Sequence, residues 1–164
     1  MSLLDKEAVK RAEKALKDFD QSLAVIILEE TARTAKDAAL SLKCEVGAIV
    51  KSLLFKTEDG YILSLVAWDI RCSLNKLKKI TNKRFISMAS PYEVKTQTGY
   101  TIGGVSPVGH LNKIDIFIDK SLKRFMNLFG AAGHPNCVFK IDFINIQKIT
   151  NGKIGDITEW ENQN

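Results

Sequence analysis

The first candidate for a catalytic or binding residue is Lys51, because it interrupts a largely apolar run of the sequence, Val46–Phe55. Such a run is typical of an interior strand, where an ammonium group without a partner is costly to bury. Two interpretations stay open from the residues alone. The side chain reaches water at a sheet edge, as most such lysines do, or it serves a binding or catalytic site.

The second candidate is the segment Thr98–Gly109, which holds four glycines. Because glycine lacks a Cβ atom, such a segment can approach a ligand closely and point several N–H groups at one oxygen. Anion nests and oxyanion holes are built in this way. The alternative is a long irregular turn, and composition does not choose between the two.

Other kinds of site find little support in the sequence. Its three cysteines are widely spaced without C-x-x-C, which argues against a disulfide framework and a thiolate zinc site: Cys44, Cys72 and Cys137. Only two histidines are present, so we expect no metal site. We interpret Cys137 as a buried, inert thiol rather than the partner of His134 in a nucleophilic pair. Ser106 lies in a motif one residue too long for the G-x-S-x-G of a serine hydrolase, so the sequence does not support that class of enzyme.

Positive charge is concentrated in one segment. The chain has a formal net charge of +5 and a pI near 9.1, and residues 70–92 carry six cations and no acid. This segment is either a solvated helix face with its loop or a surface for an RNA backbone. The candidate RNA-binding patch comprises Lys76, Lys78, Lys79, Lys83 and Arg84.

Hydrophobic periodicity and capping signals predict the elements that must position these residues. We expect helices over residues 6–19, 34–43, 74–80, 90–99 and 143–150, and strands over 22–28, 48–56, 61–68, 84–88, 114–119 and 138–143. Glu58-Asp59-Gly60 predicts a hairpin turn. Residues 124–132 fit a helix or a strand equally well.

These elements add up to an α+β fold with a mixed, mostly antiparallel sheet. With 164 residues, 45% of them apolar and 26% charged, we expect a single domain spanning residues 1–164. No apolar stretch approaches the roughly 18 residues of a membrane span. The N-terminal residues are charged rather than signal-like, so we expect a cytoplasmic protein that does not enter a membrane.

Several motifs occur together in a characteristic order: Ala32-Arg-Thr-Ala35, Ile49-Val-Lys-Ser-Leu-Leu-Phe55, Ser90-Pro91, Thr98-Gly-Tyr100, Gly103-Gly-Val-Ser-Pro107 and Ile118-Asp119. Over about residues 8–158 the chain resembles the YbaK/ProX family of aminoacyl-tRNA deacylases, which is related to the editing insertion domain of bacterial prolyl-tRNA synthetases. The resemblance implies a barrel-like core flanked by helices, with a pocket for the 3′ end of a mischarged tRNA. It implies no metal and no organic cofactor.

The resemblance also assigns roles to individual residues. It makes Lys51 the essential lysine, and Gly103 and Gly104 the amides that stabilise the developing oxyanion. The substrate-binding positions that it implies are Thr34, Ser52, Val105, Ser106, Pro107, His134 and Asn136.

The implied reaction is trans-editing by ester hydrolysis. A monomer would remove alanine or a similar small amino acid from tRNA-Pro, alone or with prolyl-tRNA synthetase as a partner. Water would attack without a protein nucleophile, and Lys51 would hold the terminal phosphate or polarise the ester. The alternatives are editing of cysteine on tRNA-Pro, editing of serine or threonine on tRNA, a catalytically silent tRNA-binding or regulatory module, and a small-molecule esterase.

Overall fold

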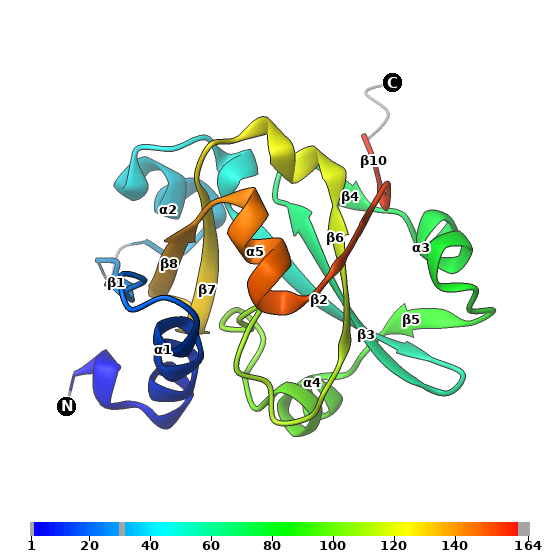
Figure 1. Ribbon diagram of the computed structural model, residues 1–164, viewed down its shortest axis with the longest axis horizontal. Helices are drawn as coiled ribbons and strands as arrows, with labels where there is room; N and C mark the ends of the chain where they lie inside the picture. Colours follow the sequence, from blue (N-terminus) through cyan, green and yellow to red (C-terminus); the bar gives the residue numbers. More distant parts are fainter. Residues whose placement is uncertain (1, 30–31, 161–164) are drawn as a thin grey trace.

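The computed structural model describes residues 2–29 and 32–160 (Figure 1). Its α-helices are α1 (Glu7–Phe19), α2 (Ala35–Leu42), α3 (Leu74–Thr81), α4 (Pro91–Thr98) and α5 (Phe143–Thr150). Its strands are β1 (Ile26–Ile27), β2 (Val50–Thr57), β3 (Gly60–Ala67), β4 (Arg71–Cys72), β5 (Ile86–Met88), β6 (Asp115–Asp119), β7 (Leu128–His134), β8 (Cys137–Ile141), β9 (Lys153–Gly155) and β10 (Thr158–Glu159). Three short 3-10 turns are η1 (Leu3–Asp5), η2 (Val46–Ala48) and η3 (Lys120–Arg124).

The largest sheet has five strands in the order β5-β2-β3-β6-β9. Strands β2 and β3 form the predicted hairpin, with Val50 opposite Ala67 at its open end and Thr57 opposite Gly60 at its turn. Strand β6 runs parallel to β3, and β9 runs parallel to β6, whereas β5 is antiparallel to β2. The sheet is therefore mixed.

Two smaller antiparallel sheets complete the fold, one in the order β1-β8-β7 and one formed by β10 and β4. A single bridge from Ile49 to Phe129 links β7 to the start of β2. The predicted α+β class with mixed, mostly antiparallel pairing is confirmed. The sheets do not close into a barrel, because among the described residues that single bridge joins β7 to the start of β2 and no strand pairs with this edge of β2 before Phe55.

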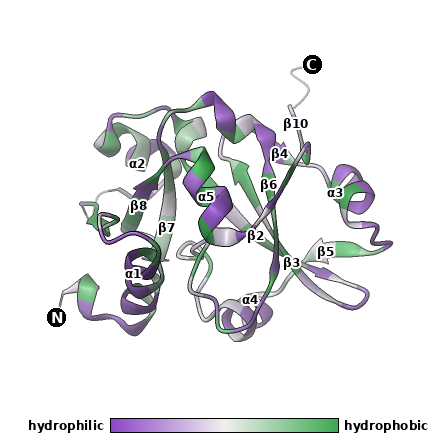
Figure 2. Ribbon diagram, in the orientation of Figure 1, coloured by the Kyte–Doolittle hydropathy of each residue, from purple (hydrophilic) through white to green (hydrophobic). Residues whose placement is uncertain are grey.

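The main core lies between α1, the five-stranded sheet and the β7–β8 hairpin. The apolar residues Val9, Ala12, Leu16 and Phe19 recur at helical spacing in α1, and the first three are 0% exposed, whereas Phe19 at the end of the helix is 39% exposed. Burying a valine or leucine side chain contributes about 1.5–3 kcal/mol relative to exposure. A second core lies on the other face of the five-stranded sheet, where Phe55 of β2 and Val66 of β3 pack against α3. Figure 2 shows helices that mix green and purple residues, as expected when one helix face is buried.

Local capping signals place the helix ends where the sequence predicts them. The Thr34 hydroxyl accepts a hydrogen bond from the Asp37 N–H at 3.1 Å and begins α2. Ser90 and Glu93 form a reciprocal capping box that begins α4. Gly99 ends α4 at a φ of +81°, a left-handed conformation that favours glycine.

One expectation about strands needs correction, and one open alternative is decided. Of residues 22–28, only Ile26 and Ile27 form a strand, because β8 offers this edge partners only at Val138 and Cys137. In the ambiguous segment 124–132 the strand β7 begins at Leu128, since pairing with β8 satisfies its backbone. In the part of the chain that the structure describes, no helix is long and apolar enough to span a bilayer.

Candidate active site

A cavity of about 600 Å³ lies along the open edge of β2. Its walls come from residues in segments 32–38, 49–54, 88–94, 102–105 and 129–138, together with Trp68. The cavity thus collects the start of α2, strand β2, the junction of β5 and α4, the glycine segment and the β7–β8 hairpin. These segments are far apart in the sequence, and only the fold brings them together.

The edge of β2 is open over a short stretch. Strand β5 pairs with Phe55–Thr57, and the Ala89 N–H donates to the Leu54 carbonyl at 3.1 Å. The next contact on this edge is the bridge at Ile49. Since backbone groups alternate in direction along a strand, those of Ser52 point to the same edge as those of Leu54, into the gap. The Ser52 hydroxyl is buried and has no hydrogen-bond partner among the described residues.

Lys51 lines this cavity and is half-buried. Its ammonium donates a hydrogen bond to the Ile70 carbonyl at 3.1 Å and lies 5.1 Å from the centre of the Trp68 ring. Trp68 also lines the cavity and is 46% exposed. The apolar run therefore accommodates a cation because a carbonyl dipole and an aromatic face receive it beside the cavity.

The glycine segment contributes Gly103 and Val105 to the cavity wall. Gly103 has a φ of +94°, and neither residue donates a backbone hydrogen bond within the described part of the chain. Gly104 is turned into the protein, where its N–H donates to the Thr101 carbonyl at 2.9 Å and its carbonyl accepts from the Gly133 N–H at 3.0 Å. A Cβ atom on Gly104 would lie 2.9 Å from the Gly133 carbonyl carbon, so only glycine fits there.

Ser106 and Pro107 lie in the core side of the same loop and do not line the cavity. The Ser106 hydroxyl accepts from the Val108 N–H at 3.3 Å, and the Ser106 carbonyl lies 2.7 Å from His110 Nε2. Burial lowers the pKa of His110, which favours a neutral ring that donates to this carbonyl. These residues shape the loop from within.

Tyr100 and Arg11 hold the far end of the loop. The Tyr100 hydroxyl donates to the Val108 carbonyl at 2.7 Å, and burial raises the pKa of Tyr100 to about 12. Arg11 of α1 donates through Nε to the Gly109 carbonyl at 2.8 Å and lies over the Tyr100 ring at 4.6 Å. The loop is thus fixed to α1 before any ligand binds.

The β7–β8 turn holds the remaining predicted positions. Asn136 donates its side-chain amide to the Glu29 carbonyl at 2.8 Å, and its N–H donates to His134 Nδ1 at 3.0 Å. Neither His134 nor Asn136 lines the cavity, whereas Pro135 between them does. Cys137 is 0% exposed, and burial raises the pKa of its thiol. This burial agrees with its interpretation as an inert core residue rather than a nucleophile.

Five of the predicted site residues line the cavity: Thr34, Lys51, Ser52, Gly103 and Val105. The cavity is also lined by four residues that were not predicted: Trp68, Arg33, Met88 and Ile102. Arg33 stands in a motif of the resemblance, so a signal existed for it. Nothing local marks Trp68, because its position beside Lys51 follows from the pairing of β2 with β3.

Acids neutralise two of the five cations of the predicted RNA-binding patch. Lys76 pairs with Asp156 at 3.1 Å and Lys83 pairs with Asp59 at 2.8 Å, so acids from distant segments neutralise both. The side chains of Lys78, Lys79 and Arg84 form no ion pair among the described residues. Figure 1 shows α3 at the opposite end of the long axis from α1 and α2.

The fold and the site define a class of protein: an α+β domain whose ligand cavity lies at an open strand edge, between a half-buried lysine and a glycine loop. A family model described as an aminoacyl-tRNA editing domain matches residues 29–149. The chain belongs to this family of aminoacyl-tRNA editing domains, the YbaK family.

Relatives of two kinds support this placement. The uncharacterized protein YwhH of Bacillus subtilis is 34% identical over 136 residues, which cover 81% of this chain and 86% of YwhH. The proline–tRNA ligase of Thermosipho melanesiensis is 33% identical over 116 residues, or 71% of this chain. The chain spans about a fifth of that ligase, with 20% of its length matched.

Solved structures show the same fold. The crystal structure of a candidate trans-editing enzyme for prolyl tRNA synthetase superposes with a TM-score of 0.89 at 34% identity, covering 94% of this chain and 98% of that one. The hypothetical protein APE2540 superposes with a TM-score of 0.83 at 25% identity, covering 91% of this chain and 99% of that one.

Proposed function

We propose that this protein is a trans-editing deacylase that hydrolyses the ester between a small amino acid and the 3′ end of a tRNA. The observation that carries the proposal is the position of Lys51. Its ammonium is held beside a cavity of about 600 Å³ that also exposes an open strand edge and the Gly103 backbone. A cation and unpaired amides facing one cavity suit a substrate that carries a phosphate and develops an oxyanion.

In this mechanism a water molecule attacks the ester carbonyl carbon and a tetrahedral oxyanion forms. The N–H groups of Gly103 and Val105, which have no partner within the described residues, stabilise that oxyanion. The bond from the carbonyl carbon to the ribose oxygen then breaks, and the ribose oxygen takes up the proton that the attacking water has lost. Free amino acid and intact tRNA are the products. Lys51 binds the terminal phosphate or polarises the ester, and Gly104 supports the loop.

We propose alanine on tRNA-Pro as the substrate, handled by a cytoplasmic monomer consisting of one domain over residues 1–164. Apolar wall residues such as Ala32, Ala35 and Ala131 support an apolar side chain on the amino acid. The similarity to proline–tRNA ligases and to a candidate trans-editing enzyme for prolyl tRNA synthetase supports tRNA-Pro and a working relation with that synthetase.

The test is deacylation of alanine, serine, threonine and cysteine, each on tRNA-Pro and on its own tRNA. We expect the wild type to hydrolyse one mischarged species. Lys51→Ala should lower the rate of that hydrolysis by about 100-fold or more. Lys14→Ala is the control. Lys14 lies on α1 outside the cavity, where it pairs with the exposed Asp18 at 2.7 Å, so its loss should leave the rate unchanged.

Two results would count against the proposal. A wild type that binds tRNA without turning over any member of the panel would favour the silent binding module. Full activity in Lys51→Ala would remove the catalytic role from this lysine even if the protein is a deacylase.

A further inference from the structure

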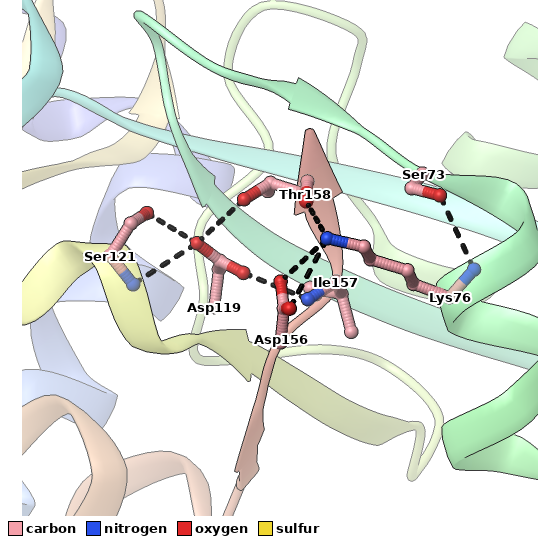
Figure 3. A network of polar contacts seen from close by, with 7 residues as sticks. All are labelled: Ser73, Lys76, Asp119, Ser121, Asp156, Ile157 and Thr158. Atoms are coloured by element: carbon pink, nitrogen blue, oxygen red, sulfur yellow. Dashed lines mark hydrogen bonds and ion pairs between the residues drawn. The ribbon is translucent and has the colours of Figure 1, made fainter. Parts of the chain in front are cut away.

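A fully buried carboxylate lies outside the cavity and has no part in the reaction proposed above. Asp119, at the end of β6, is 0% exposed. It accepts hydrogen bonds from the N–H and hydroxyl of Ser121, from the Ile157 N–H at 2.9 Å and from the Thr158 hydroxyl at 3.0 Å (Figure 3). Because burying a carboxylate is costly even when hydrogen bonds satisfy it, such a network needs a reason.

One arm of the network leads through Ser121 to Arg124. The Ser121 carbonyl accepts from Arg124 Nε at 2.8 Å. The two terminal nitrogens of Arg124 then reach the Asp69 carboxylate as a fork, at 2.9 Å and 2.7 Å. A two-point arginine–carboxylate pair fixes orientation as well as distance. Asp69 is therefore held in one place by η3.

The other arm leads through Thr158 to β4. Strand β10 pairs Thr158 with Cys72, and the Ser73 N–H donates to the Ile157 carbonyl at 2.8 Å. Figure 3 shows Lys76 reaching the same segment from α3, with bonds to Asp156 and to the Thr158 carbonyl at 2.7 Å. Strand β4 follows Ile70 directly, so this arm holds the other side of the same turn.

The two arms meet at residues 68–70, the turn that receives Lys51. The Ile70 carbonyl of this turn accepts a hydrogen bond from the Lys51 ammonium, and the Trp68 ring of the turn lies beside the same ammonium. Gly47 presses on the turn from a third side, since a Cβ atom there would lie 2.7 Å from an Asp69 carboxylate oxygen. Resting on the proposed function, we propose that Asp119 and Arg124 are positioning residues that hold this turn, and through it the Lys51 ammonium, at the cavity.

The buried Asp119 carboxylate thus helps to set the position of the catalytic lysine. Neither positioning residue lines the cavity, so neither touches the substrate there. A displacement of about 1 Å in a catalytic group can cost about 100-fold in rate. An anchor that served only the fold would change stability and leave the place of Lys51 unaltered.

The first test measures the place of Lys51 without any substrate. The folded protein is treated with a limiting amount of an acetylating reagent, and the modification of each lysine is followed by peptide mass spectrometry. We expect Arg124→Gln to raise the acetylation rate of Lys51 several-fold and to leave that of Lys83 unchanged, since Lys83 pairs with Asp59 at the β2–β3 turn, outside the network.

Asp59→Asn is the mirrored control. It breaks the ion pair with Lys83 at the β2–β3 turn, outside both arms of the network, so it should raise the acetylation of Lys83 and leave Lys51 unchanged. Asp119→Asn should act like Arg124→Gln. If Asp119→Asn fails to fold, Arg124→Gln still decides, because its pair with Asp69 lies at the partly exposed surface.

The second test uses single-turnover deacylation. We expect Arg124→Gln to lower the rate constant about tenfold, with the tRNA concentration for half-maximal rate changed less than about twofold. Asp18→Asn, which breaks the exposed pair with Lys14 on α1, should change neither quantity.

The two tests separate the failure of this inference from the failure of the proposed function. If Lys51 acetylation is the same in wild type, Arg124→Gln and Asp119→Asn, or if the acetylation of Lys83 rises together with that of Lys51 in Arg124→Gln, the positioning role is wrong. If Lys51 alone becomes more reactive while the wild type hydrolyses no aminoacyl-tRNA, the positioning of Lys51 stands and the proposed reaction falls.

Discussion

At the scale of single residues, Ser52 is the polar wall residue whose hydroxyl has no hydrogen-bond partner among the described residues. An unsatisfied buried polar group costs about 1–3 kcal/mol. The free protein therefore gains nothing from this hydroxyl, and a bound aminoacyl group could supply the missing partner.

We expect Ser52→Ala to unfold at the same temperature as the wild type or at a higher one, while kcat/KM for deacylation falls about tenfold, the loss of one hydrogen bond of about 1.4 kcal/mol. Thermal unfolding and steady-state kinetics check this. Thr98→Val is the contrast, because the buried Thr98 hydroxyl donates to the Val94 carbonyl at 2.7 Å and accepts from the Tyr100 N–H at 3.0 Å. It should lose stability. A Ser52→Ala protein with lower stability and full activity would contradict the role assigned to Ser52.

At the scale of elements, the start of α4 is tied to the β2–β3 hairpin through Glu93. Its carboxylate accepts from the Ser90 N–H at 3.0 Å and the Tyr61 hydroxyl at 2.5 Å, and it lies 3.4 Å from the Lys56 ammonium. The hydrogen bond from the Ser90 backbone, followed by that from Tyr61, lowers the pKa of Glu93 from 4.5 to about 2. The helix that carries Val94 into the cavity wall thus depends on an ionised carboxylate.

This pKa shift predicts a pH dependence of stability. Since the pKa is lower in the folded protein, the stabilisation is complete above the unfolded value near 4.5 and is lost as the pH falls toward 2. The difference in unfolding free energy between wild type and Glu93→Gln should therefore shrink between pH 5 and pH 2. In a Tyr61→Phe background one donor is missing and the folded pKa of Glu93 is lowered less, so the total loss should be smaller and should be complete at a higher pH. Denaturant unfolding across this range is the measurement, and a difference that stays constant with pH would contradict the prediction.

At the scale of the whole molecule, the net charge of +5 is distributed by the fold rather than by the sequence order. Acids from the hairpin turn and the C-terminal segment neutralise Lys83 and Lys76. Lys78 and Lys79 on α3 keep side chains without an ion pair among the described residues. If α3 binds the tRNA backbone, these two lysines carry the effect.

We expect the double reversal Lys78→Glu and Lys79→Glu to weaken tRNA binding and to reduce the slope of log K against log salt by about 2, one unit for each lost phosphate contact. Reversing Lys10 and Lys17 on α1 changes the net charge equally at the other end of the molecule (Figure 1) and should leave the slope nearly unchanged. Filter binding or fluorescence anisotropy over a salt series measures both. Equal slopes in the two double variants would show that α3 is an ordinary solvated surface.

Features that depend on neighbours along the chain follow from the local residue types. The caps at Thr34 and Ser90, the glycine stop at Gly99 and the hairpin turn before Gly60 involve groups a few residues apart, so their residue types were sufficient to place them. The motif pattern indicated the family and drew attention to Lys51 before any contact was known.

The surroundings of Lys51 depend on contacts between residues that are far apart in the sequence. The carbonyl that receives it lies 19 residues away, and the fork that holds that turn joins residues 55 apart. The same holds for the strand β7, the cavity wall at Trp68 and the neutralised cations Lys76 and Lys83. Each depends on which distant backbone or charge is packed alongside, and the free energy of such a pairing comes from the assembled core rather than from the local sequence.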